Sequence, residues 1–277
     1  MPGIPSRLER FERIGSTQDV VRAWLAEGTP EVCLAVASEQ TAGRGRQGRT
    51  WVAPPGRALM LSAGFRPDWL VPDRVWRLAA TVSLAMADAA EDHAGLRLRT
   101  IRLKWPNDLV VEGDGSAVAR GPIRKLGGVL GESDGLGSDD PRVIIGIGVN
   151  ADWPPAEFPP DLAAAMTSLR AISGGRPIDR DALLDAFVAR LDARMEALRA
   201  GYFDLGEWIA RQITTGRRVR IEHAGAPAEE TLALGVDGQT GALVVEDASS
   251  PGGERAIVAG EITRIRIPGH IADNDGA

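Results

Sequence analysis

The sequence predicts an α+β protein in which a mixed or antiparallel sheet with helices is followed by a small β-barrel. Up to residue 213, short apolar runs rich in β-branched residues alternate with longer segments that carry apolar residues at helical spacing. From residue 214 the pattern changes to short alternating runs separated by turns. The 277 residues suffice for one large and one small domain. We therefore expect domains at 1–213 and 214–268, with a disordered tail at 269–277.

The first predicted elements bring a glycine-rich loop to the end of a buried strand. Ser16–Asp19 forms a capping-box pattern before an amphipathic helix that Gly28 ends. Val32–Ser38 is a short apolar run typical of a buried strand. The strand delivers Gln40 and the loop 43–51 at its C-terminal end, a usual position for residues that bind a ligand.

The rest of the large domain reads as strands joined by hairpins, with helices mostly to one side. The residues between two of these strands, Glu112–Pro122, are rich in glycine and indicate an exposed hairpin tip. The predicted elements are strand Ala58–Phe65, helix Val75–His93, strands Leu98–Trp105, Leu109–Val111, Ile123–Glu132 and Val143–Asn150, and helices Asp181–Gly201 and Asp204–Ile213.

The small domain is predicted from short alternating runs that glycine turns separate. Asp237-Gly238 and Thr240-Gly241 mark two of these turns. Size and pattern are typical of an SH3-like barrel. The runs are Val219 to Ile221, Thr231–Val236, Ala242–Val245, Ala256–Val258 and Ile262–Ile267.

Composition limits the kinds of function that the chain can have. The net charge of −6 argues against general adhesion to nucleic acid or acidic lipid, so any anion site must be local. Cys33 is the only cysteine, which excludes an internal disulfide and a cysteine-based metal cluster. Neither a signal peptide nor an apolar run long enough for a membrane span is visible. We expect a cytoplasmic protein without membrane contact.

The loop Gly43–Trp51 has the composition of a site for a nucleotide. Its glycines permit close approach of the backbone to a ligand. Arg44, Arg46 and Arg49 supply planar groups of N–H donors that suit phosphate or carboxylate. The ring of Trp51 offers a surface on which a base can stack.

Other polar stretches end predicted strands of the same domain, and each has a plain structural alternative. Ser16 and Thr17 could only cap a helix, Lys104 could be a solvated strand end, and Asn107-Asp108 could be turn residues. The arginine loop alone could be a flexible surface or contact RNA. The stretches taken together favour one site, formed by Gln40, the loop 43–51, Lys104–Asp108, Lys125–Gly128 and Asn150.

The order of these motifs resembles that of the biotin–protein ligases. The resemblance extends over residues 14–267, and the pair GRGRQGRTW and KWPND is its most specific part. It implies a class II synthetase-like catalytic domain with an SH3-like C-terminal domain. The matching motifs are Ser16-Thr17, Gln40, GRGRQGRTW (43–51), KWPNDL (104–109), KLGGVLGE (125–132) and IGIGVN (145–150).

The resemblance implies a reaction in two steps. Biotin and ATP give biotinyl-5′-AMP and pyrophosphate, with Mg²⁺ on the ATP phosphates and at most one protein carboxylate, Asp108, on the metal. The biotin is then transferred to a lysine of a biotin carboxyl carrier protein. Both steps place charge on phosphate, so cations and backbone N–H groups directed at it are the expected catalytic device.

The resemblance also implies roles for individual residues, with Lys125 as the catalytic lysine and Arg46 facing the adenylate phosphate. The biotin site would comprise Ser16, Thr17, Gln40, Gly43, Arg44 and Gly128. The ATP and adenylate site would comprise Arg46, Arg49, Trp51, Lys104, Asn107, Lys125 and Asn150.

Few residues precede Ser16, which leaves no room for the helix-turn-helix domain of larger family members, so we expect no DNA binding. A lipoate–protein ligase or octanoyltransferase is the nearest alternative enzyme, and a nucleic-acid-binding module is the alternative from another class. The sequence leaves monomer and homodimer both open.

Overall fold

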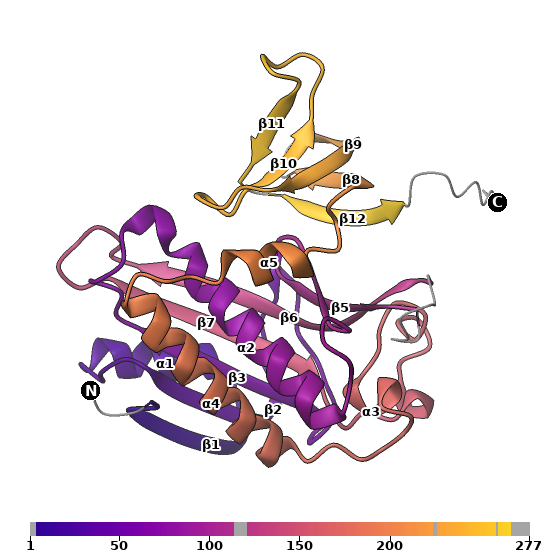
Figure 1. Ribbon diagram of the computed structural model, residues 1–277. Coiled ribbons are helices and arrows are strands. Elements are labelled where there is room, and N and C mark those ends of the chain that lie inside the picture. The colour runs from indigo at the N-terminus through magenta and orange to yellow at the C-terminus, as the bar shows by residue number, and fades with distance from the viewer. Residues whose placement is uncertain (1–3, 114–120, 224–225, 259, 267–277) are drawn as a thin grey trace.

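The computed structural model describes residues 4–113, 121–223, 226–258 and 260–266. They form a large sheet covered by helices and a separate small sheet near the C-terminus (Figure 1). The large sheet has seven strands in the order β1-β2-β3-β7-β6-β5-β4. Their bounds are β1 (Arg7–Ile14), β2 (Cys33–Gln40), β3 (Ala58–Phe65), β4 (Arg102–Lys104), β5 (Asp108–Glu112), β6 (Ile123–Asp134) and β7 (Arg142–Asn150).

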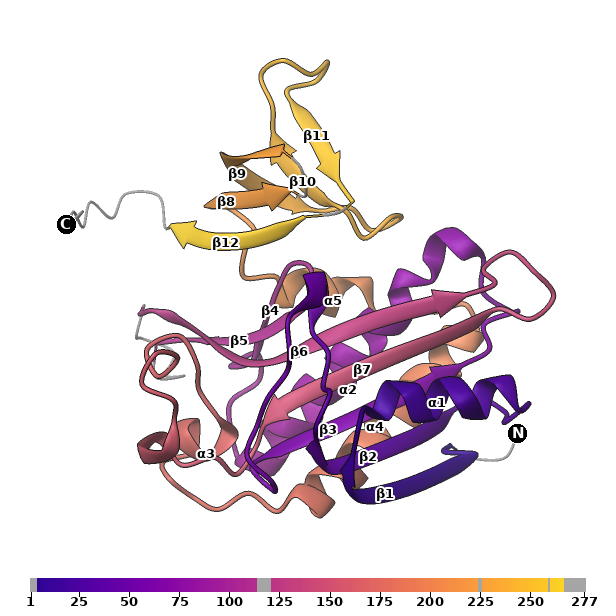
Figure 2. The same ribbon diagram turned by 180° about the vertical axis from the view of Figure 1, so that it is seen from behind.

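Helices lie on both faces of this sheet. In Figure 1, α2 and α4 run side by side across the near face, and Figure 2 shows α1 on the opposite face. The main core lies between the sheet and the α2–α4 layer, whereas α1 packs on β2, β3 and β7. The α+β prediction is therefore confirmed. The helix bounds are α1 (Thr17–Ala26), α2 (Trp76–Ala94), α3 (Leu169–Ile172), α4 (Arg180–Arg199) and α5 (Leu205–Arg211).

Strand β1 is an element that the sequence patterns do not predict. It pairs in parallel with β2, whereas all other neighbouring pairs in the large sheet are antiparallel. Its sequence, RLERFERI, is mostly charged and only half-buried, so it lacks the apolar run used to recognise a strand. Charged side chains are common on edge strands because they discourage pairing with other chains.

Alternation along β7 gives the two faces of the sheet different properties. Val143, Ile145 and Ile147 point to the main core, whereas Ile144 joins the smaller cluster beneath α1. Residues 146 and 148 share the α1 face with Ile144 because side chains alternate along a strand. Both residues are glycines, so they leave this face of the sheet free of side chains.

The predicted strand Leu98–Trp105 is wrong at its beginning. Residues 98–101 form turns and bends, and the strand β4 starts only at Arg102. Arg99 adopts a φ of 63°, and Leu98 is 71% exposed. The prediction counted Leu98 as an apolar residue of the strand, but Leu98 faces solvent, and only Ile101 and Leu103 of this run are buried in the main core.

The small sheet has five strands in the order β11-β10-β9-β8-β12. Among the described residues its outer strands, β11 and β12, do not pair with each other, so the predicted closed barrel is not confirmed. The predicted tail 269–277 and most of the predicted hairpin tip 112–122 lie outside the described residues. The strand bounds are β8 (Arg217–His223), β9 (Ala226–Val236), β10 (Leu243–Glu246), β11 (Glu254–Ile257) and β12 (Glu261–Arg266).

Trp105 joins the two sheets. It follows β4 of the large sheet, yet it is 4% exposed within the core of the small sheet, where it packs with Val219 and Leu243. Its indole Nε1 donates a hydrogen bond to the Gly241 carbonyl oxygen at 3.1 Å. The small sheet is therefore fixed to the segment that carries Lys104–Asp108. No helix among the described residues is long and apolar enough to cross a membrane.

Candidate active site

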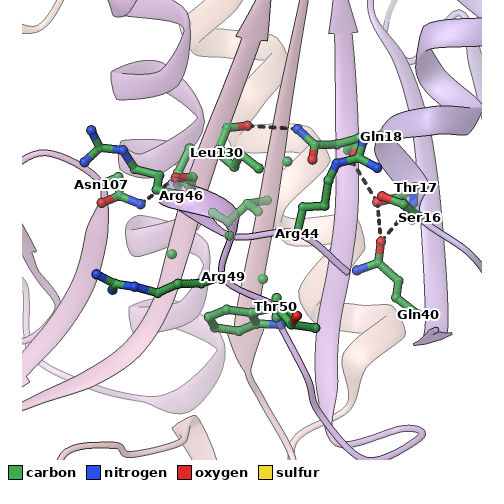
Figure 3. A pocket seen from close by; sticks show the side chains of 18 of the residues that line it. Ser16, Thr17, Gln18, Gln40, Arg44, Arg46, Arg49, Thr50, Asn107 and Leu130 are labelled. Carbon is green, nitrogen blue, oxygen red and sulfur yellow. Dashed lines mark hydrogen bonds between the residues drawn. The ribbon is translucent and has the colours of Figure 1, made fainter. Parts of the chain in front are cut away.

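A pocket opens on the α1 face of the large sheet (Figure 3). Its walls come from the start of α1, the loop 43–51, strands β3, β5, β6 and β7, and Glu261 of the small sheet. Segments far apart in the sequence therefore meet in one cavity. The predicted site residues among its lining are Ser16, Thr17, Gln40, Arg44, Arg46, Arg49, Trp51, Asn107, Asp108, Lys125 and Gly128.

The start of α1 forms a polar end of the pocket. Ser16 is the N-cap residue but its side chain makes no capping hydrogen bond, so the interpretation of Ser16 as only a helix cap is wrong. Ser16 is 3% exposed and lines the pocket. Thr17 donates two hydrogen bonds to Gln40 Oε1, from its backbone N at 2.8 Å and from its Oγ1 at 3.1 Å.

Glycines on three strand positions form the floor of the pocket. Gly128 of β6 pairs with Gly148 of β7, and Gly146 lies beside them on the same face. A Cβ atom at Gly148 would lie 2.6 Å from the ring atom Cε2 of Trp51. Glycine is therefore required at position 148 so that the indole can lie against the sheet.

The three arginines of the loop point in different directions (Figure 3). Arg44 forms a bidentate pair with Asp19 of α1 at 2.8 and 3.0 Å, and this hydrogen bonding lowers the pKa of Asp19. Arg46 donates to the Gly260 carbonyl oxygen at 3.2 Å, and its burial lowers its pKa. Arg49 pairs with Glu261, which raises the pKa of Arg49. Arg46 and Arg49 thus connect the loop to the small sheet.

Asp108 organises the two lysines of the chain. Its Oδ1 lies 2.7 Å from Lys125 Nζ, and its Oδ2 lies 3.6 Å from Lys104 Nζ. The Lys125 ammonium also lies 5.6 Å from the centroid of the Trp51 ring, within the range of a cation–π contact. The carboxylate holds Lys125 at the pocket wall, next to an aromatic surface.

Several predicted residues lie outside the lining of the pocket. Asn150 is buried, and its Nδ2 donates to the Thr167 carbonyl oxygen at 2.9 Å. The Gly43 carbonyl oxygen accepts from the Trp51 backbone N at 3.0 Å and so closes the base of the loop. Lys104 reaches Asp108 but lines a neighbouring cavity between the two sheets.

Other lining residues were not predicted from the sequence. Gln18 is 4% exposed and donates to the Leu130 carbonyl oxygen at 3.2 Å. Ser62 is fully buried beside Thr17. Gln18 directly follows Ser16-Thr17, so the motif offered a signal for it, whereas Ser62 lies in the apolar run of β3 and offered none.

The charges of the pocket suit an anionic ligand that also has a ring. Among the described lining residues, the cationic groups of Arg46, Arg49 and Lys125 face two carboxylates, those of Asp108 and Glu261. In the described part of the chain no three histidine, cysteine or acidic residues are placed to hold a metal ion.

Comparison with known proteins shows the family to which the chain belongs. A sequence model of the Biotin/lipoate A/B protein ligase family matches residues 10–150. The chain is 31% identical over 264 residues to a biotin–[acetyl-CoA-carboxylase] ligase of Mycobacterium tuberculosis, which covers 94% of this chain and 90% of that protein. The chain belongs to this family, among its biotin protein ligases.

Further relatives and solved structures extend the comparison of this ligase. It is 30% identical to the bifunctional ligase/repressor BirA of Bacillus subtilis, over 84% of this chain and 67% of that protein. The biotin protein ligase of Leishmania major in complex with biotinyl-5-AMP is 27% identical with a TM-score of 0.57, over 92% of this chain and 100% of that one. The Aquifex aeolicus ligase in complex with biotin and ATP shares the fold, with a TM-score of 0.72 at 24% identity over 94% and 99% of the two chains.

Proposed function

We propose that this ligase activates biotin with ATP and transfers it to a lysine of a biotin carboxyl carrier protein. The observation that carries the proposal is a single pocket with a neutral polar end, at Ser16 and Gln40, and a cationic end, at Arg46 and Lys125. Biotin has a neutral ureido head and a carboxylate tail, so the two ends match the two ends of this ligand. The biotin–[acetyl-CoA-carboxylase] ligases among its relatives support the same substrate.

The first step joins the biotin carboxylate to AMP. A carboxylate oxygen attacks the α-phosphorus of ATP, the bond from that phosphorus to the β-bridging oxygen breaks, and pyrophosphate leaves. Negative charge gathers on the oxygens around the α-phosphorus. The Lys125 ammonium and the Arg46 guanidinium stabilise this charge, and the partial burial of Arg46 strengthens the interaction.

In the second step the same cationic groups stabilise the phosphate of AMP as it leaves. The uncharged ε-amine of the carrier lysine attacks the biotinyl carbonyl carbon, and the bond to the phosphate oxygen breaks. AMP leaves with its phosphate charge held by Lys125 and Arg46, and the amine loses a proton to form the amide. No covalent intermediate with the protein is needed.

The remaining assignments follow the two ends of the pocket. At the biotin end Ser16, Thr17 and Gln40 contact the ureido head, and backbone groups of Arg44 and Gly128 line the same region. Gly43 contributes from the base of the loop, where its carbonyl oxygen accepts from the Trp51 backbone N. The ring of Trp51 stacks on adenine. At the nucleotide end the further contacts come from Arg49 and Asn107, which line the pocket. Lys104, which reaches Asp108, and Asn150, which is bonded to the Thr167 carbonyl oxygen, support this end from outside the lining.

Mg²⁺ enters this scheme with the nucleotide. Asp108 is the one pocket carboxylate near Lys125, and it already pairs with both lysines, so the described residues supply few oxygens for a metal. Mg²⁺ prefers octahedral oxygen ligands, which the phosphates and water supply with at most Asp108 from the protein. The metal would neutralise charge on the β- and γ-phosphates.

We also propose the domain division 1–213 and 214–268, an SH3-like character for the second domain and a cytoplasmic location without DNA binding. Apart from Trp105, which reaches in from the first domain, the buried core of the small sheet consists of residues from 219 onward, which supports a second domain packed on the first. The SH3-like character of the second domain is supported by the resemblance to family members with an SH3-like C-terminal domain.

The proposed function is tested by ATP–pyrophosphate exchange. Exchange should depend on biotin and ATP, and the adenylate should then label a purified carrier domain at one lysine. Lipoate and octanoate, the substrates of the related enzymes, replace biotin in the control reactions. Exchange with lipoate and none with biotin would overturn the proposal.

A further inference from the structure

A chain of buried polar groups leads from β3 to the biotin end of the pocket. Ser62 Oγ lies 2.8 Å from Thr17 Oγ1, which in turn lies 3.1 Å from Gln40 Oε1. Ser62 is 0% and Thr17 is 2% exposed, whereas Gln40 is half-buried at the pocket wall. Ser62 borders the pocket but exposes no surface to it, so any role in binding must act through its neighbours.

Counting donors and acceptors fixes the direction of each hydrogen bond. A backbone N–H can only donate, so the atom of Gln40 that lies 2.8 Å from the Thr17 backbone N is the amide oxygen. The same oxygen can only accept, so the single hydroxyl proton of Thr17 points to Gln40. Ser62 must then donate to Thr17 Oγ1, because the Thr17 proton is already used.

These directions determine which end of the Gln40 amide faces the ligand. The oxygen of Gln40 is held by Thr17, and in Figure 3 the nitrogen lies on the pocket side. The pocket therefore offers N–H donors at this point. A carbonyl oxygen fits such a group, whereas a ligand donor does not.

We propose that Ser62 is a positioning residue that, through Thr17, holds the Gln40 amide with its NH₂ group toward the ligand. The proposal rests on the proposed function, since it assumes that the ureido head of biotin occupies this end of the pocket. Ser62 acts by supplying the proton that leaves Thr17 Oγ1 free to donate to Gln40. Hydrogen bonds in such a chain strengthen one another.

The first test measures biotin binding to the full-length protein by calorimetry without ATP. Ser62→Ala and Thr17→Val should each raise the Kd for biotin about tenfold, the order expected for one buried hydrogen bond, and leave the Kd for ATP unchanged. Thr231→Val is the matched control, because it removes a comparable hydrogen bond to the Glu246 carbonyl oxygen in the small sheet and should not change the Kd for biotin. Unchanged biotin binding by both pocket variants would overturn the proposal.

A double-mutant cycle separates positioning from a general structural effect. In a Gln40→Ala background, Ser62→Ala should cause no further loss of biotin affinity, because the group on which Ser62 acts is gone. An equal loss in both backgrounds would show that Ser62 acts independently of Gln40 and would refute the proposal. If the unmodified protein does not bind biotin, the proposed function fails instead.

The direction of the amide is tested with 2-iminobiotin, in which a protonated nitrogen replaces the ureido oxygen. The unmodified protein should prefer biotin. Gln40→Glu presents an oxygen where the NH₂ group was, so the ratio of the two Kd values should shift at least about tenfold toward 2-iminobiotin. A ratio that does not shift would contradict the assigned direction.

Discussion

At the scale of single residues, the site depends on where a few charged groups are held. Lys125 and Lys104 are the two lysines of the chain, and both approach Asp108, while every other basic side chain except histidine is an arginine. A lysine amine is a compact charge that a carboxylate can place accurately. The contact with Asp108 therefore positions Lys125 before the ligand arrives.

Lys125→Ala should abolish adenylate synthesis while the fold is retained. The ammonium lies at the pocket wall with 40% of its side chain exposed, so its loss leaves no cavity in the core. Removal of one group that stabilises transition-state charge costs on the order of 100-fold or more in kcat. The measurements are pyrophosphate exchange and the melting temperature, and normal turnover would contradict the assigned role.

Arg46→Ala should weaken ATP binding and release the reactive adenylate. The guanidinium is partly buried and joins the loop to the Gly260 carbonyl oxygen, so its loss removes both a phosphate contact and a closure contact. Free biotinyl-AMP in the filtrate, measured by chromatography, should rise severalfold. Arg190→Ala, which removes an exposed arginine paired with Asp92 on the far face, is the control. Unchanged retention of the adenylate would refute this role.

At the scale of elements, the loop 43–51 connects helix α1 of the large domain with strand β12 of the small sheet. One end is tied to α1 through Arg44 and Asp19, and the other is tied to β12 through Arg49 and Glu261. Between these ties Arg46 is half-buried and hydrogen-bonded to Gly260, whereas Gln47 and Gly48 are exposed. The loop is therefore anchored on both sides of a short exposed tip, as expected of a segment that closes over a ligand.

Trypsin should cleave this loop in the free protein, and biotin with ATP should protect it. Closure over the adenylate excludes water from the anhydride and would also exclude the protease. The site of cleavage and its rate can be measured by mass spectrometry. Biotin alone is the control, since without a nucleotide Arg46 and Arg49 lack their phosphate partners. Cleavage that biotin with ATP fails to suppress would contradict closure.

At the scale of the whole molecule, the small sheet completes the pocket wall. Glu261 lines the pocket, Gly260 accepts from Arg46, and Trp105 inserts into the core of the small sheet. These contacts place the segment Lys104–Asp108 between the two sheets. Movement of the small sheet would therefore alter the position of Asp108 and of both lysines.

Trp105→Ala should loosen the small sheet and lower activity together. Truncation of a buried tryptophan costs about 3–5 kcal/mol, and here the lost contacts lie between the sheets. We expect a lower melting temperature, faster proteolysis near residue 214 and reduced exchange. Trp105→Phe keeps most of the packing but loses the hydrogen bond to Gly241, so its effect should be smaller. Unchanged activity in Trp105→Ala would show that the sheets work independently.

Local patterns in the amino-acid sequence predict the order of most elements and the residues that could bind a ligand. Local patterns suffice for strands such as Ala58–Phe65, because an apolar run between turns leaves few alternatives. They failed for β1, whose charged residues form a strand only because β2 offers an edge. The motif around Lys125 can also be recognised from sequence, because its residues are contiguous.

The way in which these residues work together follows from the packing of distant segments against one another. Alternation across paired strands placed Gly146 and Gly148 on the pocket side, which no single strand reveals. The directions of the loop arginines depend on partners far away in the sequence, which are Asp19 for Arg44, the Gly260 carbonyl oxygen for Arg46 and Glu261 for Arg49. The role proposed for Ser62 depends on its contact with Thr17 of α1, which in turn reaches Gln40 at the end of β2. Local alternation tells which residues of one strand share a face, but which face lines the pocket and which partners a side chain meets follow from long-range packing.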